Sequence, residues 1–336
     1  MNRNRQSLLT LMFGALVSSY AALAQSAPAI LQVDIENFVN YVEDTADITK
    51  YATLPGVTTA VPPKNFYAAV QIGDIVAVNG QPAKGTYTVS NRRINLSTTP
   101  TPGNAIADTG RVSLQIFGAE FLTSDGTIVG SLMAVGLAGA GTPPPGSPPG
   151  QSQGNNAITG GTGAFLGARG TIGQSVTPPF GSARTASIME DPANRRINGG
   201  GTVRQVLQII PMTSPAVLSD AGGPMIAHAD FSPVTTAKPA KAGEVLIVKA
   251  TGLGPTVPGV APGQPFPLDA VQPVNSPVGV SVNGQPAVVV NAIGWPGQVD
   301  TFRVDFRMPD GAASGTAAIQ LTAAWIPGAA VGIPVQ

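Results

Sequence analysis

Runs of alternating hydrophobic and polar residues recur at short intervals along the first half of the chain. A run in which every second side chain is apolar is typical of a β-strand with one buried face. Long amphipathic helices are hard to find in the same pattern. We therefore expect strands over Phe66–Val78, Gly85–Leu96, Arg111–Leu122 and Gly126–Leu137.

The residues between these runs favour tight hairpin turns. Asn79-Gly80 and Asp125-Gly126 are dipeptides that tolerate positive φ, which two-residue hairpin loops require. Consecutive strands are therefore expected to be antiparallel neighbours rather than parallel ones.

An earlier segment, Val33–Asp47, mixes carboxylates with apolar residues and indicates an edge strand followed by a polar turn. Its carboxylates are Asp34, Glu36, Glu43, Asp44 and Asp47. Carboxylate oxygens are favoured calcium ligands, but this spacing matches no EF-hand loop and lacks its glycine. A solvated surface is the preferred interpretation, and we expect no metal site.

The segment Ala138–Asn156 contains two runs of proline among glycine and serine. Proline cannot donate a ladder hydrogen bond, so we interpret the segment as a mobile loop inside the first module. A domain boundary at this place is the alternative.

After Met212 the pattern changes to that of a second, shorter β module. It includes a hairpin over Val278–Val290 with a central Asn283-Gly284 turn, and a final strand over about Gly315–Trp325. Between them, apolar residues alternate with charged ones over Phe302–Met308, which predicts one buried and one wet face. We expect a first module over 25–211, a linker over 212–230 and a second module over 231–336.

The first residues have the order of a secretory signal. Arg3 and Arg5 precede the apolar run Leu8–Val17, and small residues end in Ala22-Leu23-Ala24. We expect residues 1–24 to be removed and the protein to be secreted or held at the cell surface or in the periplasm. The apolar run is shorter than the roughly 20 residues of a spanning helix, so no membrane span is expected.

Composition excludes several kinds of chemistry. Among 336 residues, 18 Lys and Arg balance 18 Asp and Glu, so no basic field exists to attract nucleic acid. There is no Cys and one His, His228, which lies in the expected linker. Zinc sites of the Cys/His kind and a Ser-His-Asp triad are therefore disfavoured, and no cofactor is expected.

Glycine is concentrated in the string Ala157–Gly170. The spacing of Gly161, Gly163 and Gly167 is not that of a phosphate-binding loop, and no clear amphipathic helix follows. Close backbone approach at a sharply bent barrel corner explains the string better. The glycines assigned to this structural turn are Gly160, Gly161, Gly163, Gly167 and Gly170.

The string Ile158–Gly170 resembles the glycine-rich signature shared by plant dirigent proteins and allene oxide cyclases. Gly73-Asp74-Ile75-Val76 and Asp125-Gly126-Thr127 stand upstream in a similar order, so the resemblance covers about Leu31–Pro211. It implies an eight-stranded antiparallel barrel with an apolar cavity, and trimeric assembly. Arg169 stands where dirigent proteins carry an arginine close to the pocket, which makes it a candidate ligand-binding residue.

The second module resembles an Ig-like domain of the IPT/TIG type found at the C-terminus of secreted bacterial proteins. The matching segments are Ala250–Pro255, Val280–Ala287 and Phe302–Val304. This resemblance implies no catalysis. Together the two resemblances predict an all-β chain, a barrel followed by an Ig-like β-sandwich.

Three functions remain open on the sequence. The first is a secreted barrel that binds or guides a small apolar or phenolic molecule, with the Ig-like module as an accessory. The second is a non-catalytic structural or adhesion protein of the cell surface. The third is a cofactor-independent cyclase or isomerase, so whether the chain is an enzyme stays undecided.

Overall fold

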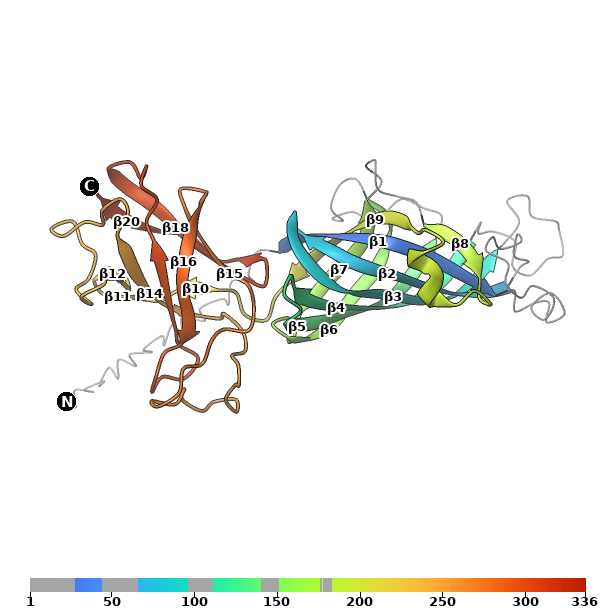
Figure 1. Cartoon of the computed structure of the whole chain (residues 1–336), viewed down its shortest axis with the longest axis horizontal. Coiled ribbons are helices and arrows are strands. Elements are labelled where there is room, and N and C mark those ends of the chain that lie inside the picture. The colour runs from blue at the N-terminus through green and yellow to red at the C-terminus, as the bar shows by residue number, and fades with distance from the viewer. Residues whose placement is uncertain (1–27, 44–65, 96–110, 140–150, 176, 178–182) are drawn as a thin grey trace, which may run out of the picture.

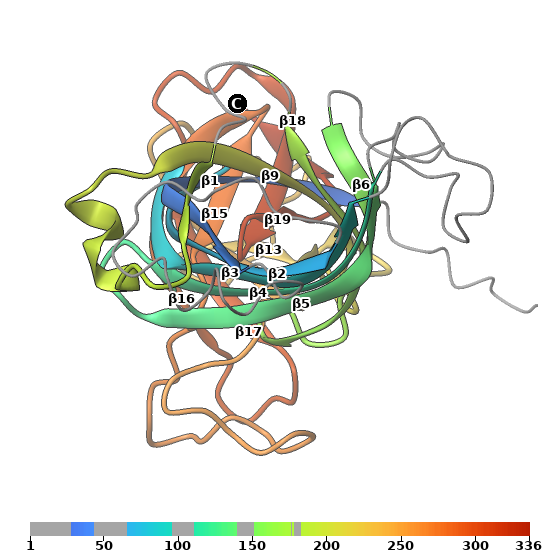
Figure 2. The ribbon, with the colours of Figure 1, turned by 90° about the vertical axis from the view of Figure 1, so that its right-hand side faces the viewer.

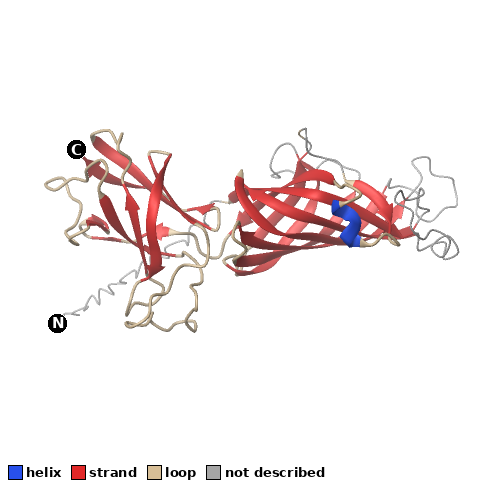
Figure 3. Ribbon diagram, in the orientation of Figure 1, coloured by secondary structure: helices blue, strands red, loops and turns tan. Residues whose placement is uncertain are grey.

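A computed structural model of the protein describes residues 28–43, 66–95, 111–139, 151–175, 177 and 183–336. The expected signal sequence and residues 140–150 of the expected proline-rich loop lie outside these ranges. Strands make up most of the described chain (Figure 3). Its single helical element is the five-residue turn η1 (Pro192–Arg196), far below the roughly 20 residues that a membrane-spanning helix needs.

The first module is a closed, eight-stranded antiparallel barrel (Figures 1 and 2). Each strand pairs with the next around the ring, and β1 closes it by pairing with both β2 and β9. In ring order the strands are β2 (Phe66–Val78), β3 (Gln81–Asn95), β4 (Arg111–Thr123), β5 (Ile128–Gly139), β6 (Gln151–Gly163), β7 (Arg169–Ser175), β9 (Gly201–Ile210) and β1 (Ala29–Glu43).

The all-β class, the barrel and the four strands expected from alternation are confirmed. Two details differ. β1 is not an edge strand, because both of its sides are hydrogen-bonded within the closed ring. Gln151–Asn156 is not loop but the start of β6, because the segment pairs with β7 at both of its ends.

The Asn-Gly turns have the geometry that the sequence indicated. Asn79 and Gly80 have φ of 51° and 74°, and Asn283 and Gly284 have φ of 51° and 80°. Two successive residues at positive φ match the twist of the strands that they join. Both turns connect antiparallel pairs, β2 with β3 and β15 (Val278–Val282) with β16 (Gln285–Gly294).

The barrel seam is clamped from outside near the bulge of β1 at Asn37, where φ is 50°. The short strand β8 (Arg184–Ser187) runs parallel to β1 where the β1–β9 pairing ends. From η1, Arg195 and Arg196 both donate to the carboxylate of Asp74 on β2, at 2.6 to 2.9 Å. Asn37 donates to the same carboxylate at 2.9 Å. One half-buried aspartate thus ties together β1, β2 and η1.

The second module is a curled sheet that folds over as a β-sandwich. Its core contains Leu246, Val304, Phe306 and Ile319, contributed by both layers. Besides β15 and β16, its strands are β10 (Ala216–Val217), β13 (Ile226–His228), β14 (Val245–Thr251), β17 (Phe302–Arg307), β18 (Gly315–Ala323), β19 (Ile326–Pro327) and β20 (Val331–Val335). A small separate pair is formed by β11 (Ser219–Asp220) and β12 (Gly223–Pro224).

This pairing differs from the linker that the sequence indicated over 212–230. Both β10 and β13 are hydrogen-bonded to β14, so residues 216–217 and 226–228 belong to the second sheet. His228 is therefore a buried strand residue and not a linker residue. Only about residues 211–215 connect the last barrel strand to the first strand of the sandwich.

Candidate ligand site in the barrel interior

The barrel interior divides into an apolar half and a polar half. The half next to the second module is filled by a core of aliphatic and aromatic side chains. Its members include Leu31, Ile35, Val78, Phe121, Leu132, Ile158, Phe165, Leu207 and Ile209. Because these side chains pack against one another, we expect a ligand site in the opposite half of the barrel.

The opposite half is lined by side-chain amides, which we call the amide belt. The belt consists of Asn40, Gln71, Asn91, Gln115, Asn156, Gln174 and Gln205. Each comes from a different strand, and each continues the two-residue spacing of the inward-facing positions on its strand. Asn91, Gln115, Asn156 and Gln205 are at most 4% exposed, so these amides face the interior and not solvent.

Pairs of the belt occupy matching positions of neighbouring strands. Asn40 pairs in register with Gln71, Asn91 with Gln115, and Gln174 with Gln205. The Gln71 amide donates to Asn40 Oδ1 at 3.3 Å. The amides of the belt therefore lie at corresponding levels of neighbouring strands, rather than at unrelated positions around the ring.

Several interior polar atoms have no hydrogen-bond partner within the described part of the chain. They are both amide atoms of Asn91, the hydroxyl of Ser113 and the hydroxyl of Tyr87. A buried polar group left without a partner costs about 1 to 3 kcal/mol. Native proteins satisfy nearly all such groups with protein, water or ligand, so this cluster calls for a hydrogen-bonding occupant.

Tyr87 lies at the boundary between the two halves. Its ring packs at tilted angles between Phe38 and Phe117, with ring centroids 5.8 and 6.1 Å apart. Burial raises the pKa of its hydroxyl well above the ordinary value, so the group stays protonated and can donate at neutral pH. The three rings form an aromatic floor under the amide belt.

Among the side chains that the structure describes, the floor and the belt carry no formal charge. An ionised ligand buried here would lack a counter-charge from these groups, which is costly in a low-dielectric interior. Amides and hydroxyls instead offer donors and acceptors to neutral hydroxyl or carbonyl groups. The described geometry fits a neutral ligand with an apolar body.

Arg169 lies on the exposed side of β7, not in the interior. Its guanidinium donates to the backbone carbonyls of Thr159 at 2.7 Å and Ala168 at 3.0 Å. The neighbouring Ala168 and Ile172 are the residues of this stretch that enter the barrel core. The arrangement braces the corner between β6 and β7, and the ligand-binding role expected for Arg169 has no support from its position.

The glycine string forms the tight corner between these two strands. Gly170 has a φ of 145°, and a Cβ there would lie 1.9 Å from the carbonyl oxygen of Gln208. A Cβ on Gly163, at a φ of 60°, would lie 2.4 Å from another carbonyl oxygen. Gly161 and Gly167 also lack room for a Cβ, whereas one on Gly160 would meet only Arg169 at 3.8 Å.

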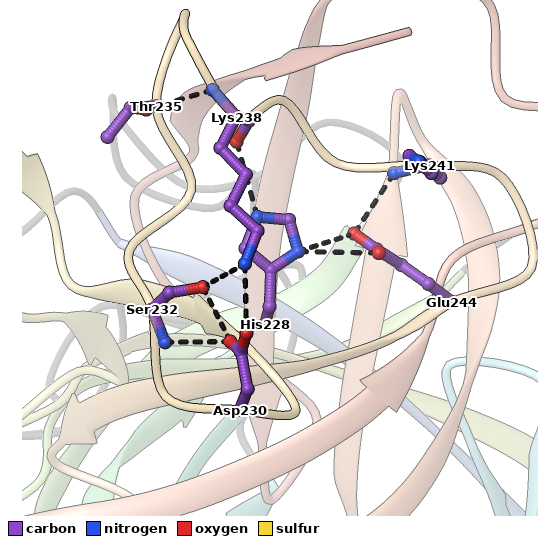
Figure 4. A network of polar contacts seen from close by, with 7 residues as sticks. All are labelled: His228, Asp230, Ser232, Thr235, Lys238, Lys241 and Glu244. Carbon is purple, nitrogen blue, oxygen red and sulfur yellow. Dashed lines mark hydrogen bonds and ion pairs between the residues drawn. The ribbon is translucent and has the colours of Figure 1, made fainter.

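A second polar network lies in the β-sandwich around His228 (Figure 4). The two ring nitrogens of His228 lie 3.3 Å from Glu244 Oε2 and 3.2 Å from the carbonyl oxygen of Lys238. Lys238 in turn contacts Asp230 and Ser232; Lys238 and Asp230 are exposed and Ser232 is half-buried. His228 is thus fully engaged in fastening one loop, and the network has the form of a structural brace.

No group of His, Cys, Asp and Glu side chains within the described ranges could hold a metal ion. In comparisons with known proteins, no family model, no curated protein and no solved structure matches this chain.

Sequence reasoning missed the amide belt, although a signal for it exists. On β4, Ser113 and Gln115 continue the inward spacing of Phe117, Ala119 and Phe121. Polar residues at positions that the alternation assigns to the interior are unusual, because burial of an amide is unfavourable without a partner. The same switch from apolar to amide occurs on β3, between Val89 and Asn91.

Proposed function

We propose that this protein is a secreted barrel that binds a small, neutral molecule carrying an apolar ring system and hydroxyl groups, of the phenolic kind. The single observation that carries the proposal is the set of buried polar atoms without protein partners above an aromatic floor. A hydroxylated ring would stack on the floor and satisfy the amides above it. The dirigent-like signature and the Ig-like accessory module agree with this role.

A protein with a purely structural role gains nothing from buried polar groups that lack partners. Barrels of this size fill readily with apolar side chains, as the half next to the second module does. The Asn91 amide and the Ser113 hydroxyl, which have no partner among the described residues of the other half, lower stability, and their retention favours a binding role over a purely structural or adhesive one. A cyclase or isomerase would use the same site; the proposed role is binding alone.

The resemblance to dirigent proteins extends the proposal to self-association of the barrel as a trimer. Support comes from an apolar face on the outer wall of β4 and β5, where exposed side chains lie next to one another in register. The face consists of Leu114, Ile116, Met133, Val135 and Leu137. A contiguous exposed apolar face of this kind marks an interaction surface. Light scattering on the intact protein and on Ile116→Lys tests it, and a monomer in both would contradict it.

The binding proposal is tested by titrating the full chain with β-naphthol, a neutral fluorescent phenol. We expect saturable binding that weakens for β-methylnaphthalene, which lacks the hydroxyl, and for β-naphthoate, which is charged. Gln205→Leu in the belt should weaken β-naphthol binding about tenfold, in keeping with the loss of one buried hydrogen bond.

The matched control is Gln208→Leu, three positions further on the same strand. Gln205 is buried and Gln208 lies at an outward position of β9, so the two variants differ in face and not in chemistry. Equal affinities for both variants, or tighter binding of β-methylnaphthalene than of β-naphthol, would contradict the proposal.

A further inference from the structure

The turn between β18 and β19 in the second module has an unfavourable backbone. Ala324 and Trp325 follow one another at φ of 47° and 63°. Two-residue hairpin turns with this conformation strongly prefer Asn and Gly, because other side chains clash with the backbone there. Strain that persists at non-glycine residues is held in place by surrounding structure and points to a role for the turn.

That role is visible in where Trp325 packs. The indole is 5% exposed and belongs, with Ala324 and Ile326, to the core cluster of the barrel rather than to that of its own module. Its ring lies 6.2 Å from the ring of Phe121, which in turn lies 5.1 Å from Phe165. The second module therefore contributes an aromatic side chain to the apolar half of the barrel.

Further contacts hold the two modules together around this turn. The side-chain amide of Asn275 donates to the carbonyl oxygen of Ile128 at the start of β5. A Cβ on Gly254 of the second module would lie 3.6 Å from Cβ of Ala164 in the glycine corner. The two contacts come from neighbouring segments of the sandwich, since the backbone N–H of Asn275 donates to the carbonyl oxygen of Pro255. They add a second place, besides the turn, at which the modules touch.

We propose that the second module is the stopper of the barrel, with Trp325 as the residue that closes it. The apolar half and the indole block the end next to the sandwich, and a ligand reaches the amide belt only from the opposite end. The direction of ligand access rests on the function proposed above, whereas closure of the barrel end by Trp325 does not. The core of the barrel is then incomplete without the second module.

The contact between the modules can be tested without a ligand by an engineered disulfide, because the chain has no cysteine of its own. The Cβ separation of 3.6 Å between positions 164 and 254 suits a disulfide, so Ala164→Cys with Gly254→Cys should form an intramolecular bond under mild oxidation. Single-cysteine variants are the controls. A pair that stays reduced while the protein remains folded would overturn the stopper.

Because position 254 has a φ of 90° and a cysteine there is strained, a second measurement avoids this residue. The chain has two tryptophans, so Trp295→Phe leaves Trp325 as the one remaining. The fluorescence emission of Trp325 should be blue-shifted, and it should resist quenching by acrylamide until the barrel unfolds. Emission and quenching typical of a solvated indole in the folded protein would overturn the proposal.

The double substitution Ala324→Asn with Trp325→Gly gives the turn its preferred residues and removes the indole. If the turn acts only within its own module, the melting temperature should rise. We expect it to fall by about 5 °C or more, because the barrel core loses a buried aromatic ring. A rise would overturn the stopper.

The direction of ligand access is tested on the cross-linked protein with β-naphthol. We expect the locked and reduced forms to bind at equal rates, since the sandwich end is closed in both. Binding slowed tenfold or more by the cross-link would overturn access from the opposite end. Absence of binding in both forms would contradict the proposed function, while the disulfide and fluorescence results would still decide the stopper.

Discussion

Asn156 on β6 donates its side-chain N–H to Oε1 of Gln115 on β4 across 3.2 Å, in the buried interior of the barrel. The two strands are not neighbours, since β5 lies between them. The residue of β5 in register with both is Gly136, which has no side chain to stand in the way. A glycine on one strand thus lets amides on the two flanking strands meet inside the ring.

This amide pair predicts a non-additive response to substitution. Gln115→Leu alone should lower the free energy of unfolding by about 1 to 3 kcal/mol, because Asn156 loses an acceptor for its buried N–H. The double variant Gln115→Leu with Asn156→Leu should cost less than the sum of the two single variants. Urea unfolding of the four proteins measures the coupling, and strictly additive costs would show that the bond does not contribute.

Tyr87→Phe should separate stability from binding. The hydroxyl of Tyr87 is buried and has no partner in the described chain, so its removal should leave the melting temperature unchanged or raise it. The same variant should bind β-naphthol more weakly, because the donor at the aromatic floor is lost. A lower melting temperature together with unchanged affinity would assign the hydroxyl to folding instead.

The glycine corner predicts a sharp contrast between two substitutions within one string. Gly170→Ala places a Cβ 1.9 Å from a backbone oxygen at a φ of 145°, and should cost more than about 3 kcal/mol or prevent folding. Gly160→Ala meets only a side-chain nitrogen at 3.8 Å and should change stability by less than about 1 kcal/mol. Thermal unfolding of both decides, and similar costs would contradict the assignment of Gly170 to close backbone approach.

Asp74 predicts a loss of stability in acid. Hydrogen bonds from Arg196, Arg195 and Asn37 hold the pKa of its carboxyl well below the ordinary value, although partial burial opposes this. A carboxyl with a depressed folded-state pKa contributes stability above its unfolded pKa of about 4, and that contribution is lost as pH falls below this value.

Asp74→Asn should therefore lower the free energy of unfolding at neutral pH by about 1 to 3 kcal/mol and flatten its decline in acid. Urea unfolding between about pH 5 and pH 3 measures the difference. The control is Asp269→Asn at an exposed position of the second module, which should change neither quantity. A decline in acid as steep in Asp74→Asn as in the parent protein would contradict the clamp.

The sequence predicted the strands well because alternation and Asn-Gly turns are local signals. Phe66–Val78 and the turn at Asn79 and Gly80 could be derived without knowing what they pack against. Closure of the ring is different, because nothing local to β1 says that it will pair with β9 on its second side. Its carboxylates suggested an edge, whereas the structure directs Asp34 outward to an ion pair with Arg204 on β9.

The site was harder to predict for the same reason. Strand parity places Asn91 on the same face as Val89, but it does not say whether that face is still enclosed by the ring at Asn91. Only the ring registers bring the seven amides together. Arg169 stood out by resemblance, yet its carbonyl partners at the corner are set by the path of the backbone between β6 and β7.

The proposed function depends most directly on what occupies the amide belt. Side-chain amide resonances of nitrogen-labelled protein, recorded during titration with β-naphthol, report on each Asn and Gln separately. We predict that the amides of Asn91, Gln115, Asn156 and Gln205 shift in a saturable manner while exposed amides such as Asn79 do not. Shifts confined to residues on the outer wall of the barrel, with the belt unchanged at saturation, would contradict the claim that the barrel interior is a ligand site.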